Sequence, residues 1–255
     1  QDAFFDGGTG CVDGVLDVGG ADPLGGAGGL IRPKGAPGTA DLSQRNAMSP
    51  EQCRQALDAG EEQAEEAARD GVDILSVGEM GIGNTTPAAA LFAALLPCTP
   101  DEAVGRGTGV DDATLEHKRK VVEDALERHA LRTHDGHAAL TAVGGFEIAA
   151  MTGLMLAAAE RRIPVMVDGF IATAAALAAL RIDENVKDYL FFGHRSAEQG
   201  HLRFFEAFNI KPLLDLGMRL GEGTGAVVAL TLLEAAVRIY QDMATFSSAN
   251  VSHDA

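Results

Sequence analysis

The sequence predicts an α/β fold with a doubly wound, mostly parallel sheet flanked by helices and a small helical appendage. The strand candidates are short continuous apolar runs, such as 164–167, which is typical of parallel strands that are buried on both faces. Longer helix-like segments separate these runs. Only 5% of the residues are aromatic and 31 are Gly, a composition that favours closely packed helices and backbone-lined turns.

The expected elements follow from local signals. Ser49 and Pro50, followed by an acid, form a helix start, and this helix should run to residue 69. Later strands end at glycines or polar residues, and later helices follow them. The other helices are expected over 87–96, 112–129, 146–161, 172–180, 197–208 and 224–244, and the strands over 15–18, 72–77, 164–167 and 189–192.

Length and composition fit one α/β domain over residues 1–255, with a Gly- and Pro-rich loop over 19–41. The 37 acidic residues outnumber 20 basic ones, so nucleic acid is not an expected partner and the acidity indicates a solvated surface. The three cysteines lack metal-ligand spacing and indicate reduced thiols in a cytoplasmic protein. We expect no metal site, no cofactor, no membrane span and no signal peptide.

Ligands of such folds bind beyond the carboxyl ends of the strands. After 72–77 comes GEMGIGNTTP, in which Gly81 allows close approach of a ligand and Thr86 is the expected N-cap of the next helix. The free N–H groups of that helix could face an anion. The alternative is a tight turn in which the glycines serve geometry only.

A second Gly-rich segment, 105–112, precedes a helix that carries Lys118. The loop and the lysine could form a phosphate clamp. The alternative is that Asp111 or Asp112 caps the helix and Lys118 is a solvated charge. Both readings stay open on the pattern alone.

Glu222 lies between two glycines, directly before a strongly apolar helix, and Leu220 beside it could supply an apolar wall. A carboxylate there either complements the helix dipole or acts as a general base facing a pocket. In GHRSAEQGH, at 193–201, the G-x-S-x-G elbow of serine hydrolases is absent. Ser196 is instead expected to be an N-cap with its hydroxyl near the ligand edge.

Five long segments occur together and in order: GEMGIGNTTPAAA, VGGFEIAAMTGLMLAAA, PVMVDGFIATAAALAA, HRSAEQGH and LDLGMRLGEGTGAVVALTLLEAA. In this order and spacing the chain resembles the nicotinate-nucleotide:dimethylbenzimidazole phosphoribosyltransferase family over roughly residues 15–250. The resemblance implies transfer of the phosphoribosyl group of nicotinate mononucleotide to a benzimidazole nitrogen, which yields α-ribazole 5′-phosphate and nicotinate during cobalamin biosynthesis.

The resemblance also assigns roles to individual residues. Glu222 matches the catalytic glutamate, which takes the proton of the attacking base. The substrate-binding residues are expected in four groups: Glu79, Gly81 and Asn84 in the nucleotide cradle; Gly107 and Lys118 at the phosphate; Asp168, Gly169 and Ser196 around the ribose and nicotinate; and Leu220 and Gly221 where the two substrates meet.

The N-terminal part of the family pattern, which supplies part of the base pocket, has no counterpart before residue 15. This departure motivates one alternative, a non-catalytic nucleotide-binding or regulatory homologue. The resemblance further implies a homodimer. It leaves the base open among dimethylbenzimidazole, another benzimidazole, adenine and a phenolic compound.

Overall fold

The computed structural model describes residues 14–19, 30–31, 36–106, 111–131, 134–218, 220–245 and 248–249. Its main sheet contains three parallel strands in the order β3 (Leu75–Val77), β4 (Val165–Val167) and β5 (Leu190–Phe192). Val77 pairs with Val167, and Val167 pairs with Phe192, so the three strands end level with one another. The predicted parallel sheet flanked by helices is confirmed.

Two further strands pair in parallel, β1 (Val15–Leu16) and β2 (Leu30–Ile31). The segment 19–41 was expected to be a loop throughout, and this expectation is wrong at β2. A two-residue strand gives no hydrophobic alternation for sequence analysis to detect, because its position is set by the partner strand.

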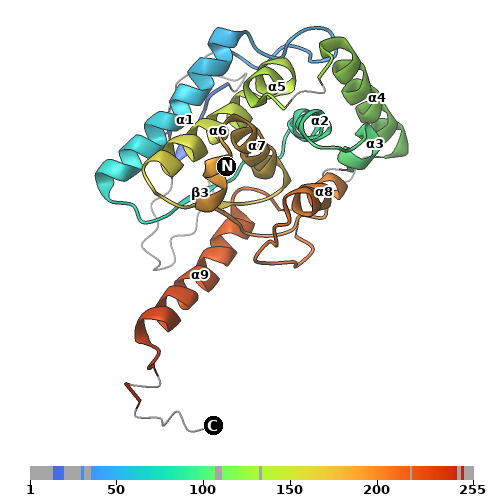
Figure 1. The fold of residues 1–255 in the computed structure, drawn as a ribbon. Helices are drawn as coiled ribbons and strands as arrows, with labels where there is room; N and C mark the ends of the chain where they lie inside the picture. Colours follow the sequence, from blue (N-terminus) through green and yellow to red (C-terminus); the bar gives the residue numbers. More distant parts are fainter. Residues whose placement is uncertain are drawn as a thin grey trace.

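The helices follow the expected order (Figure 1). They are α1 (Pro50–Asp70), α2 (Thr85–Leu95), α3 (Pro100–Ala103), α4 (Asp112–His129), α5 (Gly136–Val143), α6 (Phe146–Glu160), α7 (Phe170–Ile182), the 3₁₀ helix η1 (Glu184–Tyr189), α8 (Gln199–Phe208) and α9 (Thr224–Asp242). The sequence reading missed α3, α5 and η1. The bounds of α4 and the start of α9 match the prediction.

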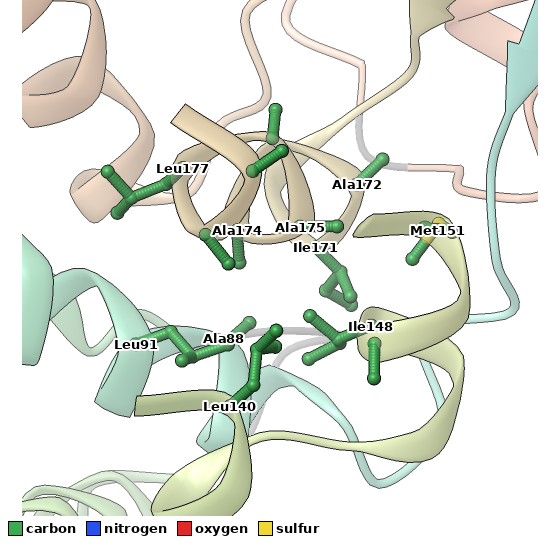
Figure 2. Close-up of a cluster of buried hydrophobic side chains, with 14 of the residues drawn as sticks. Ala88, Leu91, Leu140, Ile148, Met151, Ile171, Ala172, Ala174, Ala175 and Leu177 are labelled. Carbon is green, nitrogen blue, oxygen red and sulfur yellow. The ribbon is translucent and has the colours of Figure 1, made fainter. Parts of the chain in front are cut away.

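The larger core lies between α2, α5, α6 and α7, where Leu91, Leu140, Ile148 and Leu177 point toward one another (Figure 2). Helix α7 is apolar around most of its circumference and buried from Phe170 to Leu180. Such a helix has no face suited to water, so it must lie inside the protein. It therefore forms a rigid support behind the sheet.

Helix α9 covers the opposite face of the sheet. Met166 of β4 points to this side and packs with Ala226 and Ala229 in a small second cluster, whereas Val165 and Val167 belong to the larger core. This alternation follows the two-residue period of a strand. Beyond the sheet α9 runs away from the body of the molecule, and its end is exposed, with Tyr240 88% accessible (Figure 1).

Two expected helix caps are wrong. Thr86 lies inside α2, whose N-cap is Asn84, because Pro87 occupies the third helical position, where no intrahelical N–H bond is needed. Ser196 lies two residues before Glu198, the N-cap of α8. By contrast, Ser49 caps α1 in a full capping box, and Asp111 caps α4.

Cys53 and Cys98 are free thiols, and Cys11 lies outside the described residues. In the part of the chain that the structure describes, no helix combines the length and apolar character that a membrane span requires.

Candidate active site

Four loops meet at the carboxyl edge of the main sheet. Three of them follow β3, β4 and β5, and the fourth is the turn that precedes α9. The contacts are close: a Cβ at Gly78 would lie 2.3 Å from the Gly223 nitrogen, and one at Gly193 would lie 3.1 Å from the Ala226 Cα. The loops therefore pack backbone to backbone. Only glycine fits at Gly78 without a shift of the turn before α9, and a side chain at Gly193 would make a tight contact with the start of α9. The carboxyl edge of the sheet, where the sequence predicts ligand binding, is therefore a closely packed junction of four loops.

The turn before α9 has an uncommon backbone. Gly221, Glu222 and Gly223 follow one another with φ values of 75°, 57° and 74°. Glycine adopts this left-handed conformation freely, but at a glutamate it costs about 1–2 kcal/mol. A strained residue persists only where its surroundings hold it. One such restraint is visible: the Glu222 N–H donates to the Glu79 carbonyl at 2.7 Å.

The turn holds the half-buried Glu222 directly outside the helix, one residue before the N-cap Gly223. Leu220 is 71% exposed beside it. Gly221 packs against the loop after β3: a Cβ at this position would lie 3.1 Å from the backbone carbonyl oxygen of Glu79. The candidate base and its two neighbours are thus brought together with Glu79.

Glu79 organises the loop after β3. Its carboxylate accepts hydrogen bonds from the Gly81 N–H and, at 2.6 Å, from the Asn84 side-chain amide. Burial raises the pKa of Glu79, and these two bonds oppose the rise. All three predicted cradle residues therefore belong to one hydrogen-bonded loop that leads into α2.

Sequence reasoning missed Glu147, the second residue of α6. Desolvation raises the pKa of this carboxyl group, and its interaction with the Asn84 side chain opposes the rise. Its negative charge also raises the pKa of Glu79. The available signal was an acid in the first turn of a strongly apolar helix.

Lys118 lies beside the start of α2. Its ammonium group donates to the Thr85 hydroxyl at 2.9 Å, across 33 positions of sequence. Partial burial lowers the pKa of Lys118, and Glu198 opposes this shift. A cation next to a helix N-terminus is an arrangement that suits an anion. Gly107, the other expected phosphate contact, lies outside the described residues.

The loops after β4 and β5 carry buried polar side chains. Asp168 is 2% exposed, and Gly169 beside it would place a Cβ 3.3 Å from the His194 ring. Ser196 donates its N–H to Nδ1 of buried His201 at 3.0 Å, while Nε2 of His201 contacts the Thr173 hydroxyl at 2.9 Å. Because Nδ1 accepts, the ring proton belongs on Nε2.

Burial lowers the pKa of His201 to about 3, so this ring is neutral and serves as a fixed acceptor for the Ser196 backbone. A surface pocket of about 280 Å³ opens next to Ser196. Its walls include Arg195, Glu198 and Asp215. In the part of the chain that the structure describes, no group of three or more His, Cys, Asp or Glu residues is arranged to hold a metal ion.

Comparisons with known proteins give this junction a context. A family model described as phosphoribosyltransferase matches residues 9–251. The nicotinate-nucleotide–dimethylbenzimidazole phosphoribosyltransferase of Chlorobium chlorochromatii (strain CaD3) is 50% identical over 238 residues, which cover 93% of this chain and 67% of that protein. The protein of the same name from Chloroflexus aurantiacus (strain ATCC 29366 / DSM 635 / J-10-fl) is 49% identical, with 93% of this chain and 68% of that protein covered.

Among solved structures, CobT from Thermus thermophilus superposes with a TM-score of 0.89 at 47% identity, covering 94% of this chain and 72% of that one. The order of the motifs, the parallel sheet and the similarity of sequence and structure all agree. The chain belongs to the nicotinate-nucleotide–dimethylbenzimidazole phosphoribosyltransferase family.

Proposed function

We propose that this chain transfers the phosphoribosyl group of nicotinate mononucleotide to 5,6-dimethylbenzimidazole or a related lower-ligand base. The products are α-ribazole 5′-phosphate and nicotinate, and the reaction belongs to cobalamin biosynthesis. Support comes from two proteins named nicotinate-nucleotide–dimethylbenzimidazole phosphoribosyltransferase, whose sequences are about half identical to this one over nearly the whole chain. The observation that carries the catalytic role is the left-handed turn that holds Glu222 at the edge of the sheet.

The reaction needs a base at one point. As a benzimidazole nitrogen attacks C1′ of the ribose, the other ring nitrogen becomes acidic and must lose its proton. The Glu222 carboxylate accepts that proton, which raises the nucleophilicity of the attacking nitrogen. Gly221 and Leu220 border the place where the two substrates meet.

The leaving group needs no acid. The glycosidic bond electrons pass to the pyridinium nitrogen of nicotinate mononucleotide, and this neutralises its positive charge. Attack from the face opposite nicotinate converts the β-linked nucleotide into an α-linked product. This chemistry calls for neither a metal ion nor a cofactor.

The phosphate of the nucleotide would bind near the start of α2. Lys118 and the free N–H groups of the helix N-terminus supply positive charge there. Gly81 and Asn84 lie in the loop that leads to this helix, and we assign Gly107 to the same subsite. Gly169 and Ser196 border the ribose and nicotinate on the other side.

One assay tests the function directly. Protein, nicotinate mononucleotide and dimethylbenzimidazole are incubated with a chelator, and the products are separated by chromatography. We expect equimolar nicotinate and α-ribazole 5′-phosphate. Binding of the nucleotide without release of nicotinate would overturn the proposal and favour a non-catalytic homologue.

We also propose that residues 1–255 form a single domain, that the protein is cytoplasmic and that it assembles as a homodimer. The free thiols Cys53 and Cys98 support a reducing compartment. Sedimentation at micromolar concentration tests the assembly, and a monomer as the only species would contradict it.

A further inference from the structure

Asp168 follows β4 directly, and its carboxylate is turned toward the start of α9. One oxygen accepts the Ala226 N–H at 2.9 Å. The backbone N–H groups of Gly225 and Gly223 act on this carboxyl group as well and lower its pKa. The side chain therefore satisfies a donor that a helix N-terminus leaves free. A residue far earlier in the sequence thus holds the first turn of α9.

His194, which follows β5, lies on the other side of this carboxylate. Its Nε2 is 3.6 Å from the Asp168 oxygen, and the ring is only 3% exposed. A Cβ at Gly225 would lie 2.0 Å from the ring and 2.8 Å from the carboxylate oxygen, so the start of α9 is pressed against the pair. Burial raises the pKa of Asp168, while His194 and the helix N–H groups oppose the rise.

These contacts flank the candidate base. On one side, Glu222 is bonded through its own N–H to the Glu79 carbonyl. On the other side, the N–H of Ala226 in the first turn of α9 donates to the Asp168 carboxylate. The strained left-handed backbone at Glu222 lies between these two attachments, and loss of either would allow it to relax.

Given the proposed function, on which this step rests, we infer that Asp168, oriented by His194, is a positioning residue that fixes the Glu222 carboxylate for proton transfer. This role differs from the substrate contact expected from the sequence. Its carboxylate is buried and accepts the Ala226 N–H rather than being open to a ligand.

Kinetics separate the two roles. For Asp168→Ala we expect kcat to fall by about 10²-fold, the usual effect of an ångström-scale displacement of a catalytic group. KM for nicotinate mononucleotide should stay within about threefold, because the substrate loses no contact. Asp168→Asn, which keeps one acceptor oxygen for the Ala226 N–H, should recover part of the rate.

The sharpest measurement combines this change with Glu222→Gln. If Asp168 acts only through Glu222, its replacement should lower the rate less than about threefold when the base is already removed. Equal losses with and without Glu222 would overturn the inference, as would a raised KM with unchanged kcat.

Hydrogen exchange tests the attachment without relying on activity. Amides of residues 222–227 should exchange faster in Asp168→Ala, whereas Asp135→Ala, which removes the Ala138 cap of α5, should affect α5 alone. Unchanged exchange at 222–227 overturns the inference, even if the wild type proves inactive and only the proposed function fails. Should Asp168→Ala not fold, Gly225→Ala displaces the same turn and should show the same faster exchange and loss of kcat.

Discussion

Glu222→Gln removes the proposed proton acceptor and leaves almost everything else in place. Glutamine has the same length, and the bond from the backbone N–H of residue 222 to the Glu79 carbonyl does not depend on the side chain. Both residues have the same conformational cost at a φ of 57°. We therefore expect the melting temperature to change little.

Turnover should fall by about 10²–10⁴-fold, the range for loss of a positioned acid–base group. This corresponds to about 3–5 kcal/mol of transition-state free energy. The affinity for nicotinate mononucleotide should stay nearly constant, because this substrate gives up no proton. The assay is release of nicotinate at saturating base, measured alongside calorimetric binding and thermal unfolding.

Glu222→Gly is the matched control for the backbone. It also lacks the carboxylate, but it relieves the left-handed strain, so it should be inactive and more stable by about 1 kcal/mol. If Glu222 only complements the dipole of α9, Gln should cost a few tenths to about 1 kcal/mol of stability and spare turnover. A Gln variant that melts lower and works normally would refute the assignment of Glu222 as the base.

Three further changes probe the surroundings. Lys118→Ala should weaken binding of nicotinate mononucleotide by roughly 1.5–3 kcal/mol in calorimetry. Lys120→Ala, which replaces an exposed lysine on the same helix, should leave binding unchanged. Equal effects of the two changes would show that Lys118 is only a solvated charge. Gly78→Ala should lower turnover, and it should lower the free energy of unfolding by about 1–3 kcal/mol in denaturant unfolding. The reason is that the new Cβ would overlap the turn before α9. A variant with unchanged turnover and stability would show that this turn can shift at little cost. Glu147→Gln should raise the melting temperature at neutral pH, because a carboxyl group whose pKa is raised in the folded protein destabilises the fold once it is ionised. This gain should vanish below pH 4.5, the ordinary pKa of a glutamate side chain. A gain that stays constant with pH would contradict the prediction.

The sequence predicted those parts of the fold that depend on neighbours along the chain. Helix α4 was placed correctly because Asp111 caps its start locally. Helix α5 also has a local N-cap, Asp135, but Gly136 at its first position disfavours a helix in the sequence. This glycine is required by packing, because a Cβ there would lie 2.5 Å from the Ala178 carbonyl of α7. That constraint comes from another helix and cannot be read from the local sequence.

The candidate site divides in the same way. Glycines on both sides of Glu222 marked a turn, although its three left-handed residues became evident only from the backbone. The hydrogen-bond partners of the Asp168 and His201 side chains could not be predicted from the sequence, because partners such as Ala226 and Thr173 belong to other elements of the fold. Ser196 was expected to cap α8 with its hydroxyl, whereas its backbone N–H bonds the His201 ring.

The position of Glu222, the proposed base, follows from the path of the chain. Helix α7 occupies one face of the sheet and α9 the other, so the chain must turn sharply at the carboxyl edge before α9 begins. The sharp turn is built from consecutive left-handed residues, and Gly78 allows it to lie directly on the end of β3. Every bond described for this turn uses backbone atoms of residues 222–226, and the Glu222 carboxylate takes part in none of them. The fold therefore fixes the backbone of Glu222 and leaves its carboxylate outside the bonds that hold the turn, as the proposed role requires.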